Sequence, residues 1–409
     1  MSQTQASGDG AATVEVDTGL LVRERGLRGY GHAAARRLRT GEIGFLPVIL
    51  GLAVIAAVFQ SLNPAFLGPQ NLSNIAVQMV PIGIIAVGVV LVLLLGQIDL
   101  SVGSVSGVCA AILAVLNVKQ GMPAVVAIAL SVAAGTLIGL VQGSIFAVIG
   151  VPTFVVTLAG LIGWMGLQLY VLGETGTINV PYDGGVAKLA NTFFAQPWVG
   201  YTLGAAVVAV YLATALRADR RRAVAGLPSR TLVDTLVRAG LLAAVVFGVV
   251  AVLNQARGIP LALLIFVGLV VVLDLVLRRT RYGRSIFAVG GNVEAARRAG
   301  FNVTAIRMSV FAIASSLAAF GGVMAASRLF AVNQSSGASD VLLMAIAAAV
   351  IGGTSLFGGR GSTYSALLGI LVIQSITSGM LLLQVSSEVR FMITAKEGTR
   401  GTSLCVTSQ

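Results

Sequence analysis

The sequence predicts an all-α, polytopic integral membrane protein, a helical bundle in which several helices are short or broken. Of its 409 residues, 56% are hydrophobic and only 10% are charged, whereas a soluble domain carries about 25% charged residues. Many apolar segments reach the ~20 residues that a helix needs to cross a bilayer. The 50 glycines are typical of a membrane bundle, because small residues let helices approach closely there.

The apolar segments predict about eleven spans, with boundaries good to a few residues. They are 44–62, 74–96, 102–117, 123–149, 153–172, 199–217, 239–254, 259–277, 305–327, 340–358 and 364–384. The segment 340–358 is the weakest, because Gly352, Gly353 and Gly358 interrupt it. Helix breaks in a membrane are tolerated only where protein or a water-filled cavity satisfies the freed backbone.

The basic residues between the spans predict the orientation of the chain. The 27 Lys and Arg residues gather mainly before residue 44, in 217–238 and in 278–307. Cytoplasmic loops carry an excess of Lys and Arg, and the span count returns the chain to the same side at each of these segments. We therefore expect a cytoplasmic N-terminus. This topology explains the net charge of +12 without a nucleic-acid partner.

Three regions follow from this pattern. Residues 1–43 form a polar and basic tail that we expect to be cytoplasmic and disordered, and residues 44–394 form the transmembrane domain. The first apolar segment is followed by "NPAF" and not by a small-residue cleavage site, so we expect it to be retained as a span. The end of the chain, 395–409, is polar and too short to cross a bilayer.

Catalysis by this chain is not expected. His32 is the one histidine and lies in the tail, and Cys109 and Cys405 have no metal-type spacing. No GxxxxGK[ST] phosphate loop occurs, so we expect neither an enzyme nor a cofactor or metal bound by this chain. Asp274 lies four residues before Arg278 near a helix end, which predicts an interfacial ion pair.

A short capped helix is predicted within "YGRSIFAVGGNVEAARRAGFNV" (282–303), in the most basic loop. Asn292 suits an N-cap, and Glu294 lies in the first turn, where a negative charge favours the helix dipole. Arg297 and Arg298 fall in the last turn, and Gly300 suits the C-cap. The loop can be a solvated segment that only sets topology, but caps at both ends favour a docking helix.

This loop resembles the cytoplasmic coupling motif of ABC importer permeases, EAA followed by three residues and Gly. It reads Glu294-Ala295-Ala296, then Arg297, Arg298 and Ala299, then Gly300. The resemblance implies that the helix inserts into a groove on a separate ATP-binding cassette subunit and transmits nucleotide-driven closure, with the two alanines allowing close approach. The coupling residues would be Gly291, Asn292, Glu294, Ala295, Ala296, Arg297 and Gly300.

Two further stretches are similar to signatures of the monosaccharide permeases, the ribose, xylose and galactose importer group. They are "GQIDLSVGSVSG" (96–107) and "VIGGTSLFGGRGS" (350–362). The resemblance covers about 44–394. A basic loop and a span pair at 217–278 make the chain more like the xylose-type than the ribose-type permeases.

The resemblance implies the permease subunit of an ATP-driven monosaccharide importer in the bacterial plasma membrane, with a pentose such as xylose as substrate. It implies alternating access, a homodimer in membrane lipid, an extracytoplasmic sugar-binding protein, and ATP and Mg²⁺ held by the partner ATPase. The chain departs from the family after "RFMIT" (390–394), where the family continues into a further span. We expect that span to be lost and the C-terminus to be external.

The polar stretch at 96–107 has two interpretations. Asp99 can cap the helix that starts near Ser101, which is the commonest role of Asp at such a position. Alternatively, Asp99 and Gln97 bond a sugar hydroxyl, because acids inside a membrane are functional candidates. Gly96, Gly103 and Gly107 would allow a close helix crossing.

Polar residues in or beside the spans are candidates for the translocation pathway. They are Asn74, Gln78, Gln97, Asp99, Ser101 and Gln142. Each of them can equally form an interhelical hydrogen bond. A short echo between 98–107 and 354–362 would fit an inverted repeat with a midplane site.

Two rival functions stay open. An ABC permease for another solute, such as a branched-chain amino acid or a signalling furanose, would need charged or helix-end contacts if the substrate were zwitterionic. A self-contained secondary carrier predicts titratable residues near the midplane and no partner. The docking-type loop and the scarcity of charges in the spans disfavour the carrier.

Overall fold

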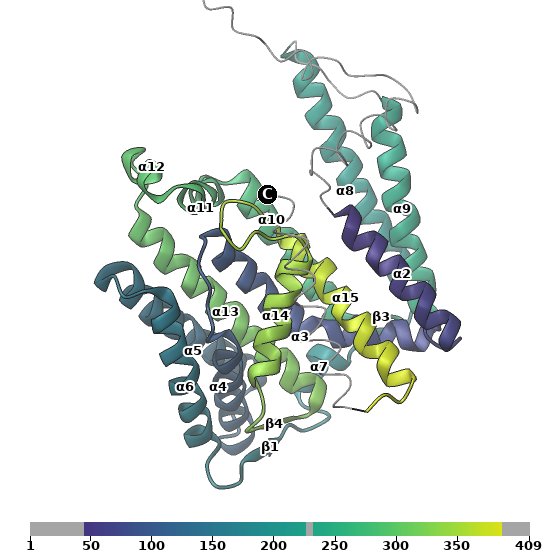
Figure 1. The fold of residues 1–409 in the computed structure, drawn as a ribbon. Helices are drawn as coiled ribbons and strands as arrows, with labels where there is room; N and C mark the ends of the chain where they lie inside the picture. Colours follow the sequence, from purple (N-terminus) through teal and green to yellow (C-terminus); the bar gives the residue numbers. More distant parts are fainter. Residues whose placement is uncertain (1–44, 226–231, 387–409) are drawn as a thin grey trace, which may run out of the picture. The chain divides into compact units, whose positions relative to one another are not determined.

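The computed structural model describes residues 45–225 and 232–386, and within them helices dominate (Figure 1). The predicted tail (1–43) and end (395–409) lie outside the described residues. Nine of the described helices are long and apolar enough to cross a membrane, and two shorter apolar helices accompany them. Each of the predicted spans corresponds to one of these helices, which confirms the all-α polytopic class.

The helices follow one another with short connections. The spans are α2 (Leu46–Leu62), α3 (Pro69–Leu94), α4 (Val102–Ala114), α5 (Ala124–Ser144), α6 (Thr153–Leu172), α8 (Pro197–Val224), α9 (Leu232–Asn254), α10 (Leu261–Arg279), α13 (Val303–Leu329), α14 (Ser339–Ile351) and α15 (Thr363–Leu382). Helices α4 and α5 continue into π-helical turns, Val115–Lys119 and Ile145–Ile149. The connecting helices are α7 (Gly185–Asn191), α11 (Arg281–Gly291) and α12 (Val293–Arg298).

Helix α3 is the centre of the bundle. From Met79 onward it is apolar on all sides and almost wholly buried, as expected for a helix surrounded by others. Helix α13 packs along α3, α4 and α5 at close range through glycines. A Cβ on Gly88 of α3 would lie 2.9 Å from the Ala314 carbonyl oxygen, and one on Gly139 of α5 would overlap that of Phe311. The predicted role of the small residues is therefore confirmed in the core.

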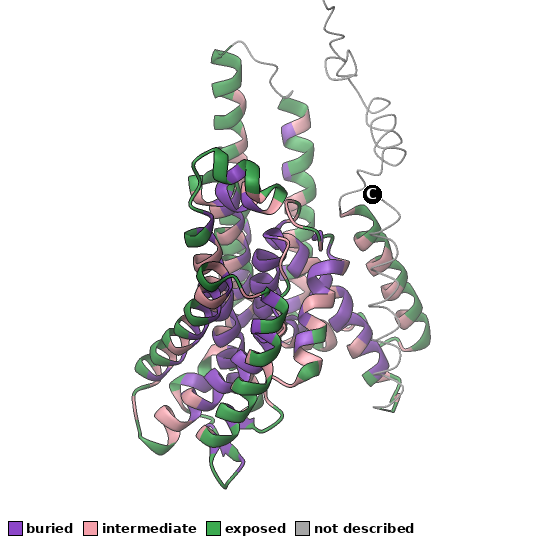
Figure 2. Cartoon of the chain, turned by 60° about the vertical axis from the view of Figure 1, so that its left-hand side comes forward, coloured by how far each residue is buried: buried purple, intermediate pink, exposed green. Residues whose placement is uncertain are grey.

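The outer helices carry the apolar surface of the bundle. Large parts of α5, α6, α8 and α9 are exposed (Figure 2), and the large apolar side chains exposed on them are mainly Leu and Val. In a membrane these faces contact lipid chains, which are as apolar as the side chains themselves.

Two short strand pairs close one end of the bundle. Strand β1 (Thr177–Asn179) pairs antiparallel with β4 (Ala331–Asn333), and β2 (Phe193–Phe194) pairs with β3 (Ile259–Pro260). The loop after α6 thus forms a small cap. The opposite end brings 95–101 and 352–362 together, since Gly359 N donates to Leu94 O at 3.0 Å.

Helix α14 is shorter than the span expected at 340–358. It ends at Ile351, and the residues up to Ser362 form a loop in which Gly353, Gly358 and Gly359 have positive φ angles. The left-handed conformation of these glycines cannot continue a right-handed helix. Residues 352–358 of the predicted span are therefore irregular backbone, with Thr354 and Ser355 buried and Phe357 exposed.

Candidate functional site

Helix α12 is a capped helix of less than two turns. Asn292 Oδ1 accepts a hydrogen bond from Ala295 N at 2.9 Å. At the other end Gly300 has a φ of +84°, Gly300 N donates to Arg297 O at 3.0 Å, and Phe301 N donates to Ala296 O at 3.1 Å. This is the Schellman arrangement, and the predicted helix with both caps is confirmed.

Most of α12 faces outward. Glu294 and Arg297 form an ion pair at 3.1 Å, and both side chains are more than 60% exposed. Ala295 is exposed, but Ala296 is buried against its own chain. Ala295 is therefore the one of the two alanines that a partner could contact, because α12 packs on the rest of the chain through Ala296.

Removing the Asn292 side chain should loosen α12 specifically. We expect Asn292→Ala to cost the helix about 1 kcal/mol, since an N-cap bond is lost, and to speed amide hydrogen exchange in 293–299. Asn302→Ala is the matched control, because Asn302 Oδ1 accepts from Ala305 N at 3.0 Å on the long helix α13. Equal exchange changes at both sites would contradict the view that α12 depends on its cap.

A shallow groove lies beside α12, between α11 and α13. Its lining includes Arg281, Tyr282 and Phe301. The Tyr282 hydroxyl lies 2.8 Å from Ser309 Oγ, and burial raises the pKa of the Tyr282 phenol. The Tyr282–Ser309 contact joins α11 to α13 and supports the outward position of α12.

A glycine junction, made of Gly96, Gly290, Gly358 and Gly359, brings three distant stretches together. A Cβ on Gly290, near the end of α11, would overlap the Leu94 carbonyl oxygen. A Cβ on Gly358 would lie 2.6 Å from Gly290 O and 2.8 Å from Gly96 N. The three stretches that carry the family resemblance thus touch backbone to backbone, a proximity that their separate glycines alone did not reveal.

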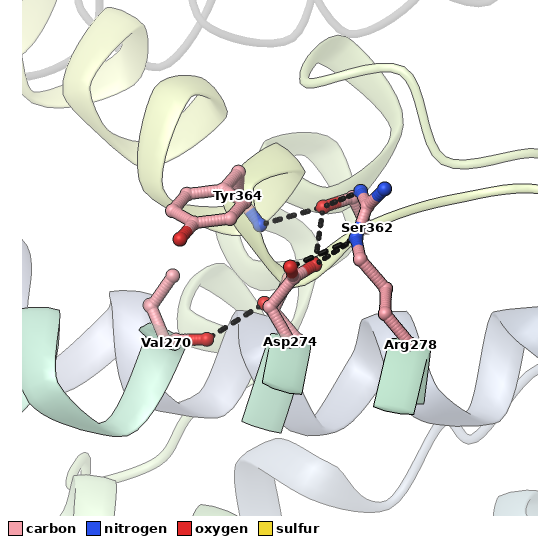
Figure 3. A network of polar contacts seen from close by, with 6 residues as sticks. Val270, Asp274, Arg278, Ser362 and Tyr364 are labelled. Atoms are coloured by element: carbon pink, nitrogen blue, oxygen red, sulfur yellow. Dashed lines mark hydrogen bonds and ion pairs between the residues drawn. The ribbon is translucent and has the colours of Figure 1, made fainter. Parts of the chain in front are cut away.

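A polar clamp, made of Asp274, Arg278 and Ser362, joins α10 to α15 (Figure 3). Arg278 Nε lies 2.8 Å from Asp274 Oδ2, which confirms the predicted ion pair. Ser362 Oγ donates to Asp274 Oδ1 at 3.0 Å and accepts from Tyr364 N, so it also caps α15. The pair is therefore part of a link between two spans.

Together these contacts attach α12 to the bundle in two places. Helix α10 leads directly into α11 and α12, and the clamp ties its end to α15. The glycine junction ties the end of α11 to the loop between α3 and α4. The segment that carries α12 is therefore in contact with this loop and with the start of α15.

Four of the six candidate pathway residues gather at the break between α3 and α4. Ser101 Oγ donates to Asp99 Oδ1 at 2.6 Å and accepts from Gln142 Nε2 of α5 at 3.0 Å. Gln97 Oε1 accepts from Thr153 Oγ1 at the start of α6. Asp99, Ser101 and Gln142 are buried.

Asp99 does not cap α4 as expected. The N-cap residue is Ser101, and no side chain accepts a hydrogen bond from the first turn. Asp99 Oδ1 instead accepts from Ser101 N at 2.8 Å, two residues on, because the chain turns before the helix begins. Asp99 therefore fixes the turn that enters the helix.

The other two candidates, Asn74 and Gln78, lie near the start of α3 and away from the break. Gln374 Nε2 of α15 donates to Gln78 Oε1 at 2.7 Å, and Arg257 Nη2 donates to Asn74 Oδ1 at 2.6 Å. In this structure both side chains bridge separate elements, which is the structural alternative to a pathway role.

Sequence reasoning missed Gln168. It is buried on α6, and its Nε2 donates to Asn333 O at 3.0 Å and to Ser336 O at 2.9 Å. Gly103 and Gly107 pack against this 333–338 loop and also meet helix side chains, since a Cβ on Gly103 would lie 3.2 Å from Leu342 Cβ of α14 and one on Gly107 would overlap Gln168 of α6. A lone glutamine in an apolar span was the available signal, since such residues need a partner.

Among residues 45–225 and 232–386, no three His, Cys, Asp or Glu side chains lie close enough to hold a metal ion. The described part of the chain instead holds an outward-facing capped helix, two sets of contacts between distant stretches and a buried polar break.

The long apolar helices define a polytopic membrane protein, and comparison with known proteins identifies it as a permease. A family profile described as "Branched-chain amino acid transport system / permease component" matches residues 71–395. The chain belongs to this family. It is 34% identical over 352 residues to the xylose transport system permease protein of Escherichia coli K12, covering 85% of this chain and 88% of that protein.

Other relatives extend the similarity. The chain is 32% identical over 358 residues to the xylose transport system permease protein of Haemophilus influenzae, covering 87% of this chain and 94% of that protein. It is 30% identical over 353 residues to the ribose import permease protein of Bacillus subtilis, covering 86% and 90%. No solved structure matches.

Proposed function

We propose that this chain is the permease subunit of an ATP-driven monosaccharide importer of the bacterial plasma membrane, with a pentose such as xylose as substrate. Its similarity to permeases named for xylose and ribose supports the substrate class. The observation that carries the transport mechanism is the exposed, doubly capped helix α12, which is linked through the glycine junction to a polar break between two spans. Such a helix suits a chain that receives mechanical work from a separate subunit.

The mechanism is alternating access. ATP and Mg²⁺ bind a separate ATP-binding cassette subunit, whose closure displaces α12. The chain works as a homodimer, and an extracytoplasmic sugar-binding protein delivers the sugar. A cytoplasmic position for α12 and for the N-terminus is part of this proposal, and the basic residues of α12 support it, because cytoplasmic loops are enriched in Lys and Arg.

The six polar candidates then contact the sugar in sequence. Asn74 and Gln78 lie toward the outer end, and the other four lie at the break, namely Gln97, Asp99, Ser101 and Gln142. Mostly neutral hydrogen-bond partners suit a polyol, because a substrate that must leave again needs weak contacts at several sites.

A branched-chain amino acid is the second candidate substrate, because the matching family profile carries that description. A zwitterion needs partners for both of its charges, and the described break offers only the carboxylate of Asp99. The sugar is therefore the better fit.

The test is ATP-dependent uptake in proteoliposomes that contain this chain, its cognate ATPase and its binding protein. We expect uptake of one labelled pentose and no uptake of labelled leucine. Vesicles without the ATPase are the control, and uptake that continues in them would favour a secondary carrier. Uptake of leucine alone would contradict the sugar assignment.

A further inference from the structure

Polar side chains from the break, from α5 and from α6 converge on Gly160 of α6, and Trp164 among them is half-buried. A Cβ on Gly160 would overlap Gln142 Nε2 and would lie 3.0 Å from Trp164 Nε1 and 3.4 Å from Ser101 Cβ. Ser101 Oγ in turn donates to Asp99 Oδ1 at 2.6 Å. Asp99, Ser101, Gln142 and Trp164 therefore form one polar cluster at the break between α3 and α4.

Two atoms of this polar cluster have no hydrogen-bond partner. Asp99 is only 3% exposed, and its Oδ2 is an unpaired acceptor. Trp164 Nε1, also buried, is an unpaired donor. Native proteins leave few buried polar atoms unsatisfied, because each costs free energy, so an unpaired donor and an unpaired acceptor in one cluster call for an explanation.

A sugar hydroxyl supplies what both atoms lack, since it donates one hydrogen bond and accepts others. Ser101 and Gln142 hydrogen-bond to each other in this structure. Either side chain can exchange this hydrogen bond for one to a sugar hydroxyl. A neutral polyol fits better than a cation, since the indole N–H repels a cation and the other carboxylate oxygen already accepts from Ser101 N and Oγ.

We propose that Asp99 Oδ2 and Trp164 Nε1, together with Gln142, form a subsite that hydrogen-bonds the hydroxyls of the monosaccharide in transit, an inference that rests on the proposed function. Asp99 lies three residues after Gly96 of the glycine junction. Displacement of α12 is thereby transmitted to the loop that carries Asp99, which couples sugar contact at the subsite to the state of the ATPase.

Two substitutions isolate the unpaired atoms. Asp99→Asn keeps an oxygen that can accept from Ser101 N and replaces Oδ2 with an amide donor. Trp164→Phe removes the N–H and keeps an aromatic ring. In the reconstituted transporter, we expect each to reduce uptake of labelled xylose about tenfold, with ATP hydrolysis retained. Trp198→Phe is the matched control, because Trp198 is 66% exposed and lies outside the polar cluster, and its uptake should be unchanged.

Deoxy sugars separate a contact from a structural role. If Asp99 Oδ2 accepts from one hydroxyl, the xylose analogue lacking that hydroxyl should be imported equally by Asp99→Asn and by the unmodified chain. If Asp99→Asn reduced the uptake of xylose and of every monodeoxy analogue by the same factor, the subsite would be overturned. Normal uptake by the unmodified chain would in that case leave the proposed function standing. Failure of the unmodified chain to import any sugar would overturn both.

A fluorescence titration does not depend on variants of the polar cluster. The chain has two tryptophans, so Trp198→Phe leaves Trp164 as its single reporter in nanodiscs. We expect xylose to shift the emission of Trp164, and leucine at the same concentration to leave it unchanged. No response to xylose from a preparation that supports uptake when reassembled would overturn the subsite.

Discussion

Gly290→Val should nearly abolish ATP-driven uptake while the chain still inserts and assembles. Any Cβ at this position overlaps the Leu94 carbonyl oxygen, which is backbone and cannot rotate away. Overpacking shifts the backbone, and a misplacement of about 1 Å can cost on the order of 100-fold in rate, so we expect uptake to fall on the order of 100-fold. Uptake and ATP hydrolysis should be measured together in proteoliposomes.

Gly268→Ala on α10 is the control, because nothing lies within 4 Å of the position that its Cβ would occupy. We expect its uptake to equal that of the unmodified chain. If Gly290→Val imported sugar at the normal rate, the glycine junction would not transmit the motion of α12.

Arg278→Ala should destabilise the bundle more than Asp274→Ala. Removing the arginine leaves the carboxylate of Asp274, whose side chain is 10% exposed, with Ser362 as its remaining partner. Removing the carboxylate leaves an arginine whose side chain is 58% exposed and can reach water. We expect Arg278→Ala to lower the free energy of unfolding by about 1–3 kcal/mol. This is less than the cost of breaking a fully buried pair, because water screens the exposed arginine.

Denaturant unfolding in detergent micelles measures this difference. Arg297→Ala is the matched control, since it breaks an ion pair whose partners are both more than 60% exposed and should cost less than about 0.5 kcal/mol. The asymmetry is the informative result. If Asp274→Ala lowered the free energy of unfolding more than Arg278→Ala did, an unpaired buried carboxylate would not be the main cost of breaking the polar clamp.

The spans and α12 could be predicted because their signals are local. Apolar length marks a span, and Asn292, Glu294 and Gly300 mark the ends of a helix within nine residues of sequence. The Asp274–Arg278 pair was predictable for the same reason, since four residues bring two side chains together on one helix.

The arrangement of the site could not be predicted, because it depends on contacts between residues that are far apart in the sequence. Nothing local indicates that Gly290 touches Leu94, because 196 residues separate them. Ser362, which completes the Asp274–Arg278 pair, lies 88 residues after Asp274 and 84 after Arg278. Trp164 reads as an apolar residue in an apolar span, and its unpaired N–H emerges only when α5 and α6 are placed together. The sequence correctly predicted that Asp99 lies at the break. Its hydrogen-bond donor is Ser101 N, one residue before α4 begins, and not an amide within the helix.

Work done on α12 should reach the break between α3 and α4. Hydrogen exchange of residues 95–101 in the assembled transporter tests it most directly, with and without a non-hydrolysable ATP analogue. We predict that the nucleotide changes exchange in this loop for the unmodified chain and leaves it unchanged in Gly290→Val. A transporter that imports sugar while 95–101 exchanges identically in both nucleotide states would contradict the account.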